Sequence, residues 1–194
     1  MTEQVIENVI KNVIKKKICM VGAFGVGKTS LVSRYVSGIF SDKYQTTVGV
    51  KIDKKVMQYQ GSEIDLILWD LAGEDAVTTV RPAHLKGAAG YILVIDGLRR
   101  NTLEVAVDLQ ERAKNAAGDV PFVCVINKAD LRESWEIQPS DLDGLVARGW
   151  TLIETSAKTG SGVEEIFRIL TDAMMQASHA QEPAQASTVD VFAG

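Results

Sequence analysis

Short apolar runs alternate with amphipathic stretches over most of the chain. Five of these runs are apolar almost throughout and are bounded by turn-forming residues: KICMVG, IDLILWD, GYILVID, PFVCVIN and WTLIET. Runs of this kind are typical of strands that are buried on both faces of a sheet. A sixth stretch, VGVKIDKKVMQY, alternates between apolar and polar residues and predicts a strand at the exposed edge of the sheet. We therefore expect a six-stranded sheet.

The stretches between these runs carry apolar residues at helical spacing. They are KTSLVSRYVSG, NTLEVAVDLQERAKNAAG, PSDLDGLVARG and SGVEEIFRILTDAMMQ. In the last one, Ser161 followed by Glu164 has the spacing of a capping box at a helix N-terminus. Strands that alternate with helices predict crossover connections and a mainly parallel sheet. The predicted fold class is α/β, with helices on both faces of the sheet and a ligand site at the carboxyl ends of the strands.

The pattern divides the chain into three regions. Residues 17–176 hold the alternating strands and helices and are expected to form one domain. Residues 1–16 form an N-terminal extension in which the pair VI recurs every four residues, which predicts one apolar helical face. Such a short helix is marginal in water, so we expect it to pack on its own domain or on a partner protein rather than on a membrane. Residues 177–194 lose the periodicity and predict a flexible C-terminal tail.

Composition and charge narrow the class of protein only slightly. The chain has 194 residues and a net charge of −4, which disfavours nucleic-acid binding because such proteins usually carry a basic face. No apolar run approaches the roughly 18 residues of a membrane span. Cys19 and Cys124 lie in apolar runs and are expected to be buried thiols of a reducing compartment. Thr2 and the cysteine-free end VFAG predict no lipid anchor, and we expect a cytoplasmic location.

The stretch GAFGVGKTS, residues 22–30, carries the first candidate chemistry. It contains G-x-x-x-x-G-K-T between a predicted strand and a predicted helix, which is the setting of a phosphate-binding loop. Its glycines let main-chain N–H groups and the helix N-terminus face an anion. Lys28 is expected to reach the terminal phosphates and Thr29 to bind Mg²⁺, although the motif does not choose between ATP and GTP. The residues expected at the nucleotide here are Gly25, Val26, Gly27, Lys28, Thr29 and Ser30.

Three further motifs directly follow predicted strands. Asp70 of WDLAGED is placed to hold Mg²⁺, and the N–H of Gly73 can approach a γ-phosphate. The Asp130 carboxylate of NKAD can accept two hydrogen bonds from guanine, and adenine lacks that donor pair. The stretch ETSAK supplies small residues beside the base. NKAD alone is equally compatible with a polar turn, so the guanine assignment depends on the four motifs together.

In this order and at this spacing, the four motifs resemble those of Ras-superfamily small GTPases over residues 17–176. The stretches TTVGVKI and YILVIDGLRRNTLE look most like the Rab branch. The end of the chain has no cysteine for a lipid, which favours a bacterial or archaeal relative. The resemblance implies a Ras-like P-loop NTPase fold and a GTP/GDP switch with Mg²⁺ as cofactor. It implies that segments 40–50 and 72–86 respond to the nucleotide and bind effector, exchange or activating proteins. It places Phe40, Thr47, Gly73, Asn127, Lys128, Asp130, Ser156, Ala157 and Lys158 at the nucleotide, and Thr29, Thr47 and Asp70 at the metal.

Two residues depart from the family pattern. Phe24 stands where the Ras branch has a glycine, close to where the arginine of an activating protein would enter. Glu74 stands where the family usually has a glutamine that positions the attacking water, and its charge disfavours the γ-phosphate. With Lys28 and Gly73 it completes the candidate catalytic residues, and we expect slow GTP hydrolysis. The alternative is a scaffold or regulatory subunit that holds a guanine nucleotide without hydrolysing it; an ATP-dependent enzyme would require NKAD and ETSAK to be coincidences.

Overall fold

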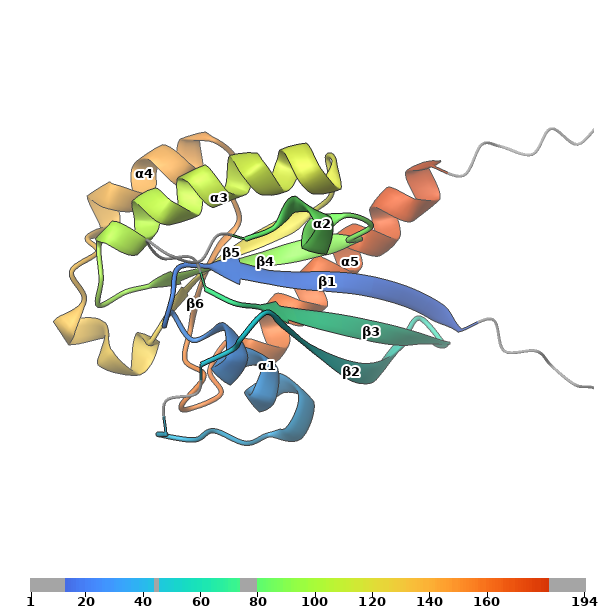
Figure 1. The fold of residues 1–194 in the computed structure, drawn as a ribbon, viewed down its shortest axis with the longest axis horizontal. Coiled ribbons are helices and arrows are strands. Elements are labelled where there is room, and N and C mark those ends of the chain that lie inside the picture. Colours follow the sequence, from blue (N-terminus) through green and yellow to red (C-terminus); the bar gives the residue numbers. More distant parts are fainter. Residues whose placement is uncertain (1–12, 44–45, 74–79, 182–194) are drawn as a thin grey trace, which may run out of the picture.

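The computed structural model of the protein describes residues 13–43, 46–73 and 80–181 (Figure 1). In these residues, six strands form one sheet in the order β2-β3-β1-β4-β5-β6. Among these strands, β2 and β3 pair antiparallel and the other neighbours pair parallel. The strands are β1 (Ile14–Gly22), β2 (Val50–Tyr59), β3 (Ser62–Leu71), β4 (Gly90–Asp96), β5 (Phe122–Asn127) and β6 (Leu152–Thr155). The six-stranded, mainly parallel sheet expected from the sequence is confirmed.

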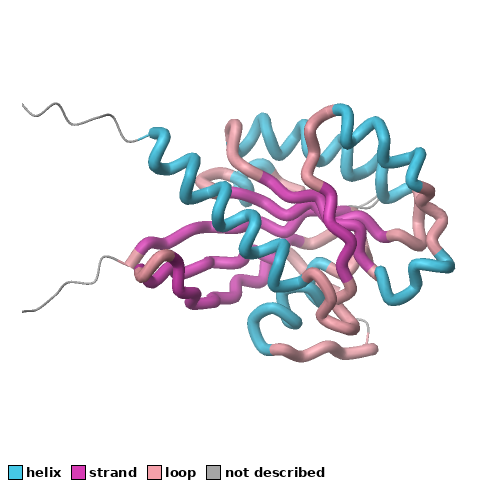
Figure 2. The backbone as a smooth tube through the Cα atoms, turned by 180° about the vertical axis from the view of Figure 1, so that it is seen from behind, coloured by secondary structure: helices cyan, strands magenta, loops and turns pink. Residues whose placement is uncertain are grey.

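Helices cover both faces of the sheet, as the α/β pattern predicts. On one face lie α1 (Lys28–Ser37) and α5 (Val163–Gln181), where the Tyr35 and Phe167 rings stack with their centroids 3.8 Å apart. On the other face lie α2 (Pro82–Leu85), α3 (Asn101–Ala117) and α4 (Pro139–Ala147). The 3-10 helix η1 (Ala129–Ser134) follows β5. Figure 2 shows α5 running along the sheet on the face opposite α3 and α4.

The burial of each strand follows its sequence pattern. Every residue of β4 is buried, because this strand lies in the middle of the sheet with helices on both sides. The edge strand β2 alternates between partly buried and exposed residues, as its sequence predicts. In α3 the buried residues Thr102, Ala106, Leu109 and Ala113 recur every three or four positions and form one stripe against the sheet.

Two elements extend beyond the bounds expected for the domain. Strand β1 begins at Ile14, inside the segment expected to be a helical extension, because Ile14 pairs with Ile64 of β3 and packs on the core. At the other end α5 continues to Gln181, inside the expected tail. The Lys16 Nζ donates to the Ser178 Oγ at 2.5 Å, so a hydrogen bond joins the start of β1 to the last part of α5. The rest of the extension and tail, residues 1–12 and 182–194, lies outside the described residues.

The expected capping box at Ser161 is wrong. Helix α5 begins at Val163, and the carbonyl of Gly162 accepts the first helical hydrogen bond, from the N–H of Ile166 at 3.1 Å. Gly162 has φ +71°, a conformation that favours glycine at this position. The main-chain N–H of Ser161 donates instead to the Thr159 hydroxyl.

The parallel strands bring the sequence motifs to one end of the sheet. The phosphate-loop motif follows β1, Asp70 lies near the end of β3, NKAD begins at the end of β5, and Thr155 to Lys158 closes β6. Loops at the carboxyl ends of parallel strands are the usual place for a ligand in an α/β fold. Across the described ranges, no helix is long and apolar enough to span a membrane.

Candidate nucleotide site

A pocket of about 370 Å³ opens at the carboxyl ends of the strands. Most residues that the sequence places at a nucleotide line it: Gly25, Gly27, Lys28, Thr29, Ser30, Phe40, Thr47, Gly73, Asn127, Lys128, Asp130, Ala157 and Lys158. Three others, Val26, Asp70 and Ser156, are not among the lining residues of this pocket and are at most 1% exposed. The candidate catalytic residue Glu74 lies outside the described residues.

The phosphate loop has the backbone that its glycines allow. Gly27 has φ +100° and precedes the first residue of α1, and a side chain on it would overlap the Asn127 amide. Gly73 lies so close to the loop that a Cβ would overlap the main chain of Ala23 and Phe24. The D-x-x-G segment and the phosphate loop are therefore packed together, backbone against backbone.

Lys28 is the buried cation of this loop. Its side chain folds back, and its Nζ donates to the carbonyls of Gly22 and Ala23 at 3.0 Å each. Burial lowers the pKa of Lys28 to about 8, the Asp70 carboxylate acts against this shift, and the charge of Arg99 adds to it. A buried ammonium held mainly by carbonyl groups is short of negative charge, which a phosphate would supply.

Asp70, Thr29 and Thr47 form a cluster of oxygen atoms beside Lys28. The buried Asp70 Oδ2 accepts hydrogen bonds from the Thr29 hydroxyl at 2.7 Å and from the Thr47 hydroxyl at 3.0 Å. Within the described part of the chain, the buried Asp70 Oδ1 has no hydrogen-bond partner. Burial raises the pKa of Asp70 from its ordinary value, against the hydrogen bonds from both threonines.

This cluster fits Mg²⁺ in its choice of atoms. One carboxylate and two hydroxyls are hard oxygen ligands, and Mg²⁺ commonly takes one or two carboxylates and completes its shell with phosphate oxygens and water. The partnerless Asp70 Oδ1 is a costly buried group that a cation or its bound water would satisfy. In the described ranges no three His, Cys, Asp or Glu residues converge on a metal position, so ligand oxygens would have to complete the shell.

The NKAD and TSAK segments form the opposite end of the pocket. Asn127 donates from Nδ2 to the carbonyl of Val26 at 2.9 Å and accepts at Oδ1 from the N–H of Ala157 at 3.2 Å. It therefore ties the phosphate loop to the loops after β5 and β6. The Ser156 hydroxyl donates to the Asp130 Oδ1 at 2.6 Å and orients this exposed carboxylate at the pocket.

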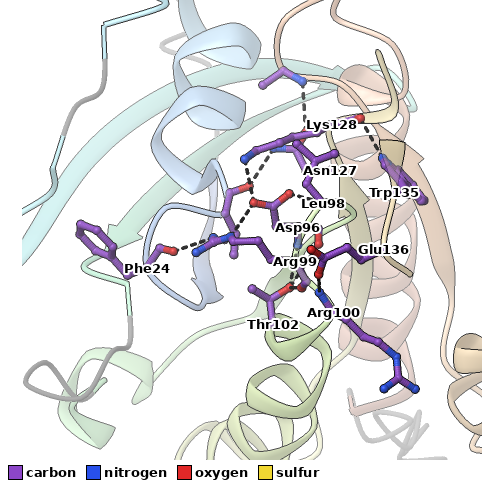
Figure 3. Close-up of polar contacts among 12 residues, drawn as sticks. Phe24, Asp96, Leu98, Arg99, Arg100, Thr102, Asn127, Lys128, Trp135 and Glu136 are labelled. Atoms are coloured by element: carbon purple, nitrogen blue, oxygen red, sulfur yellow. Dashed lines mark hydrogen bonds and ion pairs between the residues drawn. The ribbon is translucent and has the colours of Figure 1, made fainter. Parts of the chain in front are cut away.

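A polar network beside the phosphate loop, drawn in Figure 3, is not among the features expected from the sequence. Asp96, at the end of β4, is fully buried, and its Oδ2 accepts from the Lys128 Nζ at 2.7 Å and from the Arg99 Nε at 2.8 Å. The Arg99 guanidinium also donates to the carbonyl of Phe24 at 2.8 Å. The signal was available, since GYILVID ends in an aspartate at the same strand end as the other motifs and GLRR follows it. Leu98 and Leu131, which line the pocket, were missed as well.

The fold and the site together define a P-loop protein with a nucleotide-sized pocket at the carboxyl ends of a parallel sheet. The sequence profile of the Ras family matches residues 17–176. The chain is 32% identical over 184 residues to Ras-related protein Rab-32 of Homo sapiens, which covers 90% of this chain and 80% of that protein. It is 34% identical over 172 residues to Ras-related protein Rab-7L1 of Rattus norvegicus, with 84% and 83% covered. The chain belongs to the Ras family, with similarity to its Rab-type members, and the resemblance stated from the motifs is confirmed.

Proposed function

We propose that the protein is a guanine-nucleotide switch that hydrolyses GTP slowly. The observation that carries the proposal is a single pocket with Lys28 and Thr29 at one end and the oriented Asp130 carboxylate at the other. A phosphate-binding end and an end suited to guanine are what one GTP or GDP molecule requires. Membership of the Ras family supports the same assignment.

Asp130 would select the base. Its carboxylate accepts hydrogen bonds and, with one oxygen already engaged by Ser156, it presents a fixed acceptor to the N1–H and exocyclic amine of guanine. Adenine in the same place lacks this pair of donors and would leave the second carboxylate oxygen unpaired, which is a large penalty. Lys128 and Ala157 would line the sides of the base, and Phe40 would pack against it.

Lys28, Thr29, Thr47 and Asp70 would hold the phosphates and Mg²⁺. Lys28 would exchange its loop carbonyls for phosphate oxygens, because an anion compensates its buried charge better than a carbonyl does. The hydroxyls of Thr29 and Thr47 would face the metal, with Asp70 behind them. When bound, Mg²⁺ neutralises charge on the β- and γ-phosphates.

Thr47 and Gly73 would make the site a switch. Thr47 joins the segment 40–50 to Thr29 and Asp70, so the position of that segment depends on groups at the γ-phosphate. Gly73 packs on the phosphate loop at the start of the segment 72–86. Loss of the γ-phosphate would release both segments, which we propose as the surfaces for effector, exchange and activating proteins.

Slow hydrolysis is proposed because of Phe24 and Glu74. The Phe24 side chain lines the pocket and is 37% exposed, so it occupies space from which an activating arginine would approach. Glu74 follows Gly73 directly, and a carboxylate there repels the charge that develops on the γ-phosphate. If hydrolysis is absent altogether, the protein is instead a guanine-nucleotide-bound scaffold or regulatory subunit.

The test begins with the nucleotide that copurifies with the full-length protein. After denaturation, chromatography should identify GDP or GTP, and single-turnover hydrolysis of loaded GTP should be slow but measurable. Glu74→Gln should accelerate it in the purified protein, whereas Phe24→Gly should accelerate it only when cell extract supplies an activating protein. Equal affinity for ATP and GTP would refute the guanine switch, and partner-free turnover of about 1–100 s⁻¹ would refute slow hydrolysis. No hydrolysis even in the double variant would favour the scaffold.

A further inference from the structure

The turn after β4 carries two consecutive arginines with different partners. Arg99 reaches the phosphate loop, where its guanidinium donates to the Phe24 carbonyl at 2.8 Å (Figure 3). Arg100 lies on the other side of the turn and pairs with the Asp141 carboxylate of α4 at 2.6 Å. Both side chains are substantially exposed, at 40% for Arg99 and 63% for Arg100. The two neighbours are similar in chemistry, but among the described residues Arg99 contacts the phosphate loop, whereas Arg100 contacts Asp141 and Glu136.

Hydrogen bonds to Asp96 and Thr102 fix the Nε and the main chain of Arg99. The Asp96 carboxylate accepts the Arg99 Nε at 2.8 Å, and its other oxygen accepts the N–H of Leu98 at 3.1 Å. Asp96 is fully buried, and the Thr102 hydroxyl donates to the Arg99 carbonyl at 2.7 Å. Since both the main chain and the Nε of Arg99 are fixed, its remaining donors are aimed at the phosphate loop with little freedom to lose.

Side chains from inside and outside the phosphate loop donate hydrogen bonds to its carbonyls. Lys28, which bonds the carbonyls of Gly22 and Ala23, is the residue expected to turn to the phosphates. The contacts from Arg99 to Phe24 and from Asn127 to Val26 come from outside the loop and need not be given up when a nucleotide binds. The Arg99 contact is charge-assisted and exposed, whereas the Asn127 contact is neutral and buried.

The same carboxylate also holds the base-reading motif. Asp96 Oδ2 accepts the Lys128 Nζ at 2.7 Å, and Lys128 lines the pocket at the base end. Asp96 therefore sits between the phosphate loop, reached through Arg99, and the NKAD segment, reached through Lys128. A nucleotide leaves when the main chain around its phosphates opens, and the Arg99 contact opposes that opening.

We infer that Arg99 is a positioning residue that latches the phosphate loop to Asp96 and thereby sets how slowly the nucleotide dissociates. The inference rests on the proposed guanine-nucleotide function and deepens it, because it assigns control of nucleotide release to a residue outside the four motifs. The latch acts through the Phe24 carbonyl, so it works at the phosphate end and leaves the choice of base to Asp130.

The first test measures dissociation of fluorescent GDP from the full-length protein after addition of excess unlabelled GDP. Arg99→Ala should accelerate release about tenfold, the effect expected from one lost charge-assisted hydrogen bond. Arg99→Lys, which keeps the charge but cannot span both partners, should fall between Arg99→Ala and wild type. Arg100→Ala is the matched control and should stay within about twofold of wild type, because exposed ion pairs contribute little. Equal rates for Arg99→Ala and Arg100→Ala would overturn the latch.

A second measurement separates a latch from general loosening of the fold. GMP lacks the phosphates that the loop surrounds, so Arg99→Ala should reduce the preference for GDP over GMP and leave the preference for GDP over xanthosine diphosphate unchanged. Equal weakening of GDP and GMP would indicate a merely structural role and refute the latch. Arg99→Lys carries the same prediction with a smaller effect if Arg99→Ala does not fold. Failure of the wild type to bind any guanine nucleotide would refute the proposed function itself, whereas normal wild-type binding with unchanged release in Arg99→Ala would refute the latch alone.

Discussion

The two ends of the nucleotide pocket differ in how completely their polar groups are paired. At the base end, Asn127 is bonded on both sides of its amide and Asp130 is oriented by Ser156. At the phosphate end, Lys28 bonds carbonyls of its own loop, and Asp70 Oδ1 has no hydrogen-bond partner in the described part of the chain. The polar groups of the base end are therefore held by other groups of the protein, whereas the phosphate end holds buried charges that a ligand and a cation would satisfy.

The largest effect is expected at the base end. Asp130→Asn replaces an acceptor by a group that also donates, so GTP affinity should fall on the order of a thousandfold and xanthine nucleotides should become preferred. Competition binding with GTP, ATP and XTP measures this change. Asp143→Asn, the same substitution at an exposed position of α4, is the control and should change nothing. An unchanged GTP preference in Asp130→Asn would show that the base end does not read guanine.

Lys28→Ala tests the charge of the phosphate end. GTP and GDP affinity should fall on the order of a hundredfold, because a cation is lost from a desolvated anion site. GMP should suffer less, since it lacks the terminal phosphates that Lys28 is expected to meet. Lys158→Ala, which removes a lysine at the base end, should not alter the ratio of GDP to GMP affinity. If both lysine variants change this ratio equally, the division of the pocket into two ends is wrong.

Asp70→Asn separates stability from binding. The amide carries no charge, so the nucleotide-free protein should keep or raise its thermal midpoint, because the cost of a buried, incompletely paired carboxylate is removed. Affinity for GTP in Mg²⁺ should nevertheless fall about tenfold, the loss expected when a metal-supporting group is removed. Differential scanning fluorimetry without nucleotide and titration with GTP and Mg²⁺ measure the two effects. A lower midpoint with unchanged affinity would show that Asp70 is only a structural residue.

The smallest effect is expected outside the pocket, at the Arg100–Asp141 pair. The Arg100 side chain lowers the pKa of Asp141 to about 2. A carboxyl whose folded pKa is depressed stabilises the protein above its unfolded pKa and loses this contribution as the pH falls through the folded value. Asp141→Asn should therefore lower the thermal midpoint slightly at pH 7 and progressively less toward pH 3, with nucleotide affinity unchanged. A midpoint difference that grows on acidification would contradict this.

The fold and most of the site could be predicted because their signals are local in the sequence. Each strand is a short apolar run, and each of the four motifs is a few consecutive residues at the end of a strand. The Asp96 network could not be assembled in this way, because its partners Phe24, Arg99 and Lys128 come from three different loops. Arg99 and Arg100 are adjacent, and only the directions of their side chains decide which one contacts the phosphate loop. The spacing of residues in the sequence does not give these directions.

The start of β1 was missed for a related reason. The stretch IKKKI looks like a solvated polar segment, but in a strand its lysines alternate between the two faces of the sheet. Lys16 reaches Ser178 at the end of α5, and the Lys17 ammonium lies 3.8 Å from the centre of the Trp69 ring. Long lysine stems cover apolar surface while their charged ends find partners, so three lysines are compatible with a strand whose first residues are partly buried.

The Asn127 amide also has a consequence for how the chain folds. It joins Val26, 101 positions earlier, to Ala157, 30 positions later, so the pocket wall closes only after β1, β5 and β6 are in place. Contacts between residues this distant in sequence form late in folding, because the chain must first lose the entropy of closing a long loop. Ligand that binds only the folded state would stabilise the domain as a whole, by about 2.7 kcal/mol at a hundred times its dissociation constant. Chains that end before β6 would lack this stabilisation by nucleotide. Nucleotide binding during synthesis would therefore begin only when β6 has been added to the sheet.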